Sequence, residues 1–99
     1  MKNLERIESN ANAKIKLVAK LHAHKYRKEE SLFVAEGVRL VEMALAARWP
    51  MRFAFVSDNA LKNPRVVKAV ELLQDRECPV YQLDGDLYSK ASDTVNGQG

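Results

Sequence analysis

The sequence predicts an α/β fold, a three-layer α/β/α sandwich in which a mostly parallel sheet lies between two layers of helices. Apolar residues at helical spacing alternate along the chain with short apolar runs that are typical of buried strands. The connections between these segments are short, and no repeat or linker interrupts them. The chain has 99 residues, of which 46% are apolar and 29% are charged, a composition typical of one small globular domain.

Four helices and three strands alternate in the predicted order, beginning and ending with a helix. Apolar spacing predicts helices over residues 11–24, 38–47, 64–75 and 84–92. Short apolar runs predict strands over residues 32–35, 51–56 and 80–83. Trp49-Pro50 is expected to end the second helix, because the residue before proline disfavours the α region. Asn63-Pro64 places a proline in the first turn of the third helix, where it is tolerated. Residues 1–10 are expected to form a flexible lead.

Several classes of protein are excluded by the composition. The longest apolar run is far shorter than the roughly 20 residues that a membrane span needs. The N-terminus is polar and lacks the apolar stretch of a signal peptide. Cys78 is the only cysteine, so no internal disulfide is possible. We therefore expect a cytoplasmic protein with no membrane partner.

Positive charge is concentrated at the start of the chain. Residues 1–28 hold eight Lys or Arg against two acids, a net charge of +6, whereas residues 29–99 hold eight bases against eleven acids, a net of −3. A basic block on a small domain is typical of a polyanion partner. The charge pattern alone is equally consistent with a solvated helix face.

The basic residues of this block fall in two groups. Lys16 and Lys20 are predicted to project from the first helix one turn apart, where like charges mildly destabilise a helix. The segment Lys25-Tyr26-Arg27-Lys28 then places an aromatic residue among three cations. Lysine and arginine bind phosphate, and a tyrosine ring offers a surface on which a base stacks. Tyr26 could instead fill the core between the first helix and the first strand, and the sequence leaves both roles open.

No catalytic, cofactor-binding or metal site is predicted within the chain. The sequence lacks the nucleophile elbow, the Walker loop, the dinucleotide fingerprint and the zinc-protease motif. His22, His24 and Cys78 fit no recognised zinc spacing. Gly37 lies at a strand-to-helix junction whose N–H groups could face an anion, although relief of crowding at a tight turn is the favoured role.

Three other residues invite functional interpretations that the pattern does not favour. Asp58 follows the second predicted strand, where a phosphate-accepting aspartate could lie, but Ser57-Asp58-Asn59 is typical of a helix cap or turn. Trp49 and Phe53 are predicted to be packing residues rather than base-stacking platforms.

The segment from Lys25 to Glu42 (KYRKEESLFVAEGVRLVE) closely resembles the N-terminal substrate-binding domain of the SpoU/TrmH-type RNA ribose methyltransferases. The stretch Asn12 to Leu21 resembles a pattern that precedes this signature in the family. Asp93-Thr94 and Gln98-Gly99 resemble the family's Asp-Thr-x-x-Pro-Gln-Gly, with Gly97 in place of the proline. The resemblance extends from about Asn12 to Gly99, nearly the whole chain.

The resemblance implies that residues 11–99 form an RNA substrate-binding domain with the sandwich fold of the ribosomal proteins that bind kinked RNA. The full enzyme would transfer a methyl group from S-adenosylmethionine to a ribose 2′-hydroxyl, most often in ribosomal RNA. In the family, a knotted catalytic domain binds that cofactor, carries the catalytic arginine and forms a homodimer. None of its motifs occurs here, so we expect an N-terminal fragment of a longer protein.

By position, we expect the phosphate contacts of such a domain to come first from the basic block, at Lys16, Lys20, Lys25, Arg27 and Lys28. Gly37 and Arg39, at the start of the helix after the first predicted strand, are the next candidates. Glu36 belongs to the signature and is expected to have a structural role. Two alternatives stay open: a free-standing RNA-binding protein, and a small α/β signalling module in which Asp58 receives phosphate.

Overall fold

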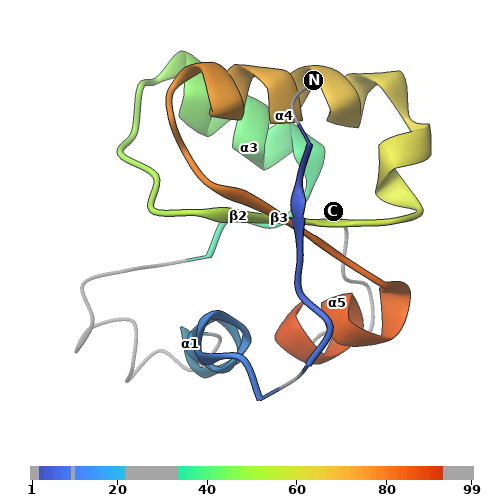
Figure 1. The fold of residues 1–99 in the computed structure, drawn as a ribbon. Coiled ribbons are helices and arrows are strands. Elements are labelled where there is room, and N and C mark those ends of the chain that lie inside the picture. The colour runs from blue at the N-terminus through green and yellow to red at the C-terminus, as the bar shows by residue number, and fades with distance from the viewer. Residues whose placement is uncertain (1–2, 10, 22–33, 93–99) are drawn as a thin grey trace.

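A sheet of three parallel strands lies between two pairs of helices in the computed structural model, which describes residues 3–9, 11–21 and 34–92 (Figure 1). On one face, α1 (Ala13–Leu21) packs against α5 (Gly85–Ser92). On the other face, α3 (Val38–Ala46) packs against α4 (Pro64–Asp75). This arrangement confirms the predicted α/β/α sandwich. In the part of the chain that the structure describes, no helix is long and apolar enough to cross a membrane.

The sheet is centred on its last strand in sequence. The strand β3 (Val80–Leu83) lies between β1 (Glu5–Arg6) and β2 (Ala54–Ser57), and both pairings are parallel. Because successive parallel strands are joined through helices, the carboxyl ends of all three strands lie at one edge of the sheet.

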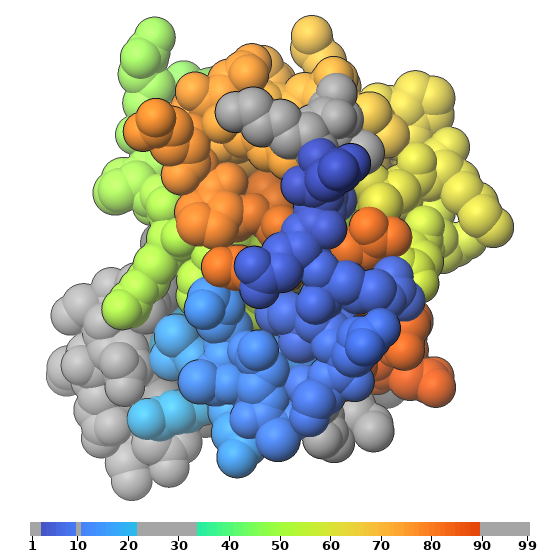
Figure 2. All heavy atoms as spheres, in the orientation of Figure 1, coloured from blue at the N-terminus to red at the C-terminus, as the bar shows by residue number. Residues whose placement is uncertain are grey.

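The strand β1 lies inside the segment that we expected to be a flexible lead. Glu5 pairs with Tyr81 in register, and the N–H of Ile7 donates to the carbonyl of Gln82 at 3.0 Å. Ile7 itself is buried, and residues 3–9 form a band across the surface of the molecule (Figure 2). The sequence pattern does not reveal this strand, because it is two residues long and both are exposed and charged.

The strand predicted over residues 32–35 is not confirmed at residues 34 and 35, the half of it that the structure describes. Val34 and Ala35 are half-buried but belong to no strand, and Leu32 and Phe33 lie outside the described residues. A short apolar run identifies a buried segment, but it does not show whether a neighbouring strand forms a hydrogen-bonded ladder with it.

The helices follow the predicted pattern closely. Pro64 begins α4 as predicted, and the Asn63 side chain accepts a hydrogen bond of 2.9 Å from the N–H of Arg65. Asn12 caps α1 in the same way through the N–H of Lys14, at 2.8 Å. The helix α1 is described as far as Leu21, and the last part of the predicted range, residues 22–24, lies outside the described residues. The strand β2 begins at residue 54, three residues later than predicted, and a short 3-10 turn, η1 (Ala60–Lys62), follows it.

Both α3 and α4 end in a Schellman motif without glycine. Arg48 and Glu77 have positive φ values, 57° and 59°, a conformation that favours glycine. In each motif the N–H of the next residue donates to the carbonyl five residues earlier at 3.0 Å, Trp49 to Ala44 and Cys78 to Leu73. The sequence predicts where both helices end, to within one residue, but it does not signal the Schellman motifs, because the usual glycine is missing.

The hydrophobic core has two parts, one on each face of the sheet. The α3/α4 side is built from Val56, Val66, Val70, Leu73, Cys78 and Val80. The α1/α5 side is built from Ile7, Ile15, Leu83 and Leu87. Leu83 of the central strand is completely inaccessible to solvent.

Candidate nucleic-acid interface

The helix α1 presents two of its three lysines to solvent. Lys16 and Lys20 are exposed one turn apart, while Ile15 is buried on the opposite side of the helix. Lys14 has a different role, because its ammonium nitrogen lies 5.2 Å from the centroid of the Tyr81 ring in a cation–π contact. The outer face of α1 can therefore contact phosphates through Lys16 and Lys20.

The most basic segment of the sequence is not placed by the structure. Lys25, Tyr26, Arg27 and Lys28 lie outside the described residues. Their assignment as RNA contacts stays a prediction, and the choice between stacking and packing for Tyr26 stays open.

Gly37 immediately precedes α3 and is buried, with φ 91° and ψ 146°. Residues with side chains rarely adopt this conformation, so the backbone itself requires glycine here. Gly37 has no side chain with which to cap the helix, and its carbonyl accepts from the N–H of Val41 at 3.1 Å. Arg39 is exposed in the first turn of α3.

The structure does not gather the candidate residues that it describes into one cluster. The helix α1 lies on one face of the sheet and α3 on the other, and no contact joins these two helices (Figure 1). Lys16 and Lys20 therefore belong to a different face from Gly37 and Arg39. An RNA that contacts both groups must extend around an edge of the sheet.

Glu36 of the signature lies beside α5. Burial raises the pKa of Tyr88 to about 12, and the nearby charge of Glu36 adds to this effect. Tyr88 also packs against the core of the α1/α5 side. This position accords with the structural role expected for Glu36.

Asp58 forms a clamp across the carboxyl edge of the sheet that the sequence did not reveal. Its two carboxylate oxygens accept hydrogen bonds of 2.8 and 2.9 Å from the guanidinium of Arg6, which is 52 residues away in sequence. The side-chain amide of Gln82 donates to the same carboxylate at 2.7 Å. Hydrogen bonds from Arg6 and Gln82 lower the pKa of Asp58 to about 2. The expected capping role belongs instead to Ser57, whose hydroxyl accepts from the N–H of Ala60 at 3.1 Å.

The potential metal ligands of the sequence do not converge in the described residues. There, no group of three or more His, Cys, Asp or Glu side chains could hold a metal ion, and His22 and His24 lie outside this part of the chain. Cys78 is buried in the core of the α3/α4 side, and burial raises the pKa of its thiol. This environment favours the neutral thiol and suits a packing residue.

Comparison with known proteins identifies the family. The fold is similar to that of an rRNA methyltransferase from Sinorhizobium meliloti, with a TM-score of 0.73 and 24% sequence identity. The alignment covers 98% of this chain but 35% of that structure's chain, so this sequence spans about a third of its length. No curated protein matches the sequence. The family model of the MRM3-like substrate binding domain matches residues 12–99. The chain therefore belongs to the family of MRM3-like substrate binding domains.

Proposed function

We propose that this chain is the RNA substrate-binding domain of an S-adenosylmethionine-dependent RNA 2′-O-ribose methyltransferase of the SpoU/TrmH type, with ribosomal RNA as the substrate. The observation that carries the proposal is the family match over residues 12–99, because that family is described as substrate-binding. The motifs around Lys25 to Glu42 support the SpoU/TrmH assignment. The similar solved structure is named as an rRNA methyltransferase, which supports a ribosomal substrate here.

The described residues suggest how this domain would hold RNA. Lys16 and Lys20 supply mobile positive charges on the outer face of α1, and Arg39 supplies a planar guanidinium beside Gly37. Such contacts give affinity and register that depend on salt but not on sequence. Selectivity would come from the shape of the RNA and its unpaired bases.

We propose that the remaining functions belong to parts of the protein outside this chain. These are the S-adenosylmethionine site, the catalytic residues and the contact that forms a homodimer. No residue of the chain is proposed to be catalytic. We further propose that the protein acts in the cytoplasm.

The proposal is tested by binding of the chain to unmodified ribosomal RNA fragments across a salt series. Two charge-reversed variants, Lys16/Lys20→Glu and Lys25/Arg27/Lys28→Glu, are expected to bind more weakly. Each lost phosphate contact should reduce the slope of log K against log salt by about 0.7 to 0.9.

A matched control for the α1 variant is Lys62/Lys68→Glu, which reverses two exposed charges on the side of the sheet away from α1. It should retain more affinity than Lys16/Lys20→Glu. Equal binding by the wild type and both charge-reversed variants would show that the basic residues form only a solvated face. Absence of RNA binding at low salt would contradict the proposed function itself.

A further inference from the structure

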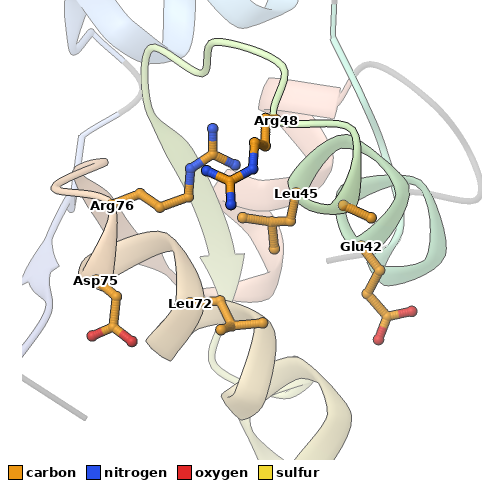
Figure 3. A pocket seen from close by; sticks show the side chains of 7 residues that line it. Glu42, Leu45, Arg48, Leu72, Asp75 and Arg76 are labelled. Atoms are coloured by element: carbon orange, nitrogen blue, oxygen red, sulfur yellow. The ribbon is translucent and has the colours of Figure 1, made fainter.

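A groove of about 490 Å³ lies between the C-terminal ends of α3 and α4. These helices lead into β2 and β3, so the groove is at the edge of the sheet opposite to Gly37 and the Asp58 clamp. Nothing in the proposed function uses it. Its lining includes Glu42, Leu45, Arg48, Leu72, Asp75 and Arg76 (Figure 3).

Two guanidinium groups dominate the charge facing this groove. Figure 3 shows those of Arg48 and Arg76 at one end of the groove, with the carboxylates of Glu42 and Asp75 pointing away from them. Glu42 is already paired, because its carboxylate accepts a 2.9 Å hydrogen bond from Nε of Arg65. That ion pair lowers the pKa of Glu42. The groove therefore presents positive charge although its lining holds acids and bases in equal number.

Leu72, which lines the same groove, is an exposed apolar side chain. The large apolar residues exposed in the described part of the chain are Met43, Trp49 and Leu72, at 59%, 41% and 40%. All three lie in the C-terminal half of α3 or α4, or just after α3. Trp49 was predicted to be a packing residue rather than a base-stacking platform, and the choice between these two roles stays a prediction.

The backbone of Trp49 lies beside one of the two guanidinium groups. Trp49 directly follows Arg48, and its carbonyl accepts a 3.2 Å hydrogen bond from Nη2 of Arg76. Arg48 has φ 57° and occupies the left-handed position of the Schellman motif, where glycine adopts the backbone conformation at a lower cost in free energy than arginine does.

We propose that this groove is a second contact surface for single-stranded RNA, an inference that rests on the proposed function of RNA binding. The guanidiniums of Arg48 and Arg76 would take a phosphate group, because their planar forks match its oxygens. A base or ribose would pack on Leu45 and Leu72, which line the groove. A protein segment is the competing occupant, and the test below separates the two.

Trp49 provides a direct reporter, because it is the only tryptophan of the chain. A ten-nucleotide uridine RNA is titrated into the chain at several salt concentrations while the fluorescence of Trp49 is recorded. We expect saturable quenching. The variant Arg48→Gly should bind this RNA about tenfold more weakly or worse, with a salt slope reduced by about 0.7. Glycine suits the conformation of residue 48, so this loss would not come from unfolding.

Two further variants sharpen the result. Arg76→Gln should weaken the quenching as Arg48→Gly does. Lys62→Gln removes one positive charge before the start of α4, about 18 Å away along the helix, and should leave the quenching unchanged.

The outcomes separate the groove from the proposed function. If Lys16/Lys20→Glu loses structured RNA while Arg48→Gly binds the oligonucleotide like the wild type, the groove proposal fails and the proposed function stands. If neither RNA binds at low salt, both fail. If Trp49 fluorescence responds to the concentration of the chain but not to RNA, a second copy covers the groove and the proposal is overturned.

Discussion

Gly37 offers a sharp test of how the sequence determines the start of α3. The residue has φ 91° and ψ 146°, a region that a residue with a Cβ reaches at a cost of about 1 to 3 kcal/mol. The substitution Gly37→Ala also makes the unfolded chain less flexible, which by itself favours folding by about 0.4 to 1 kcal/mol. The expected net loss in the free energy of unfolding therefore lies between about 0 and 2.6 kcal/mol, and its central value of about 1.3 kcal/mol corresponds to roughly 5 to 10 °C in Tm for a domain of this size.

The assay is urea unfolding followed by far-ultraviolet circular dichroism, with the m-value as a check that the unfolded state is unchanged. Gly85→Ala is the matched control because it makes the same chemical change at an ordinary φ. Gly85 is the exposed first residue of α5, and a Cβ there would meet nothing within 4 Å. This variant should be more stable than the wild type by about 0.5 kcal/mol.

The two glycines must therefore respond with opposite signs. If Gly37→Ala is more stable than the wild type, the conformational argument for Gly37 is refuted. The same conclusion follows if both variants shift stability in the same direction. RNA binding by Gly37→Ala, measured well below its Tm, then shows whether this glycine has a role beyond backbone conformation.

Three further predictions concern the rest of the fold. Glu77→Gly should raise the free energy of unfolding by about 0.5 to 1 kcal/mol in urea, because Glu77 occupies the left-handed position of a Schellman motif; a loss of stability would contradict that assignment. The pKa of Asp58 is lowered to about 2 in the folded protein, whereas the usual carboxyl pKa is about 4. The stability that the clamp with Arg6 contributes is therefore complete above about pH 4 and is lost as the pH falls toward 2. Tm measured from pH 5 to pH 2 should therefore fall more steeply for the wild type than for Asp58→Asn, and parallel curves would exclude the clamp as a source of stability. Leu83→Ala should lower the free energy of unfolding by about 3 to 5 kcal/mol in the same urea assay, because Leu83 is completely buried; a loss below about 1 kcal/mol would mean that the site collapses around the smaller side chain.

The candidate interface was predictable only in part. The exposure of Lys16 and Lys20 follows from the helical spacing of their apolar neighbours, and the structure places both on the outer face of α1. The special place of Gly37 before a helix was also visible in the sequence. That α1 and α3 lie on opposite faces of the sheet was not, because local periodicity does not specify which face a helix covers.

The groove at the ends of α3 and α4 shows the same limit. The sequence indicates that α3 ends near Trp49-Pro50, but not that Arg48 adopts a left-handed conformation and brings its side chain toward Arg76. Glycine is the usual signal for such an end, and its absence concealed the motif. The exposure of Trp49 likewise depends on which neighbours cover it, and these come from other parts of the chain.

Local signals in the sequence were sufficient to predict the α/β class, the start of α4 at Pro64, the strand β3 and the basic outer face of α1. Each depends on residues within a few positions of one another, through apolar spacing, capping side chains and proline. Only the tertiary structure decided that Glu5 and Arg6 form a strand, that Arg6 clamps Asp58 across the sheet and that two helix ends enclose a groove. These features depend on pairings between residues tens of positions apart. Such a pairing leaves no local pattern in the sequence, because the two partners interact only after the chain has folded.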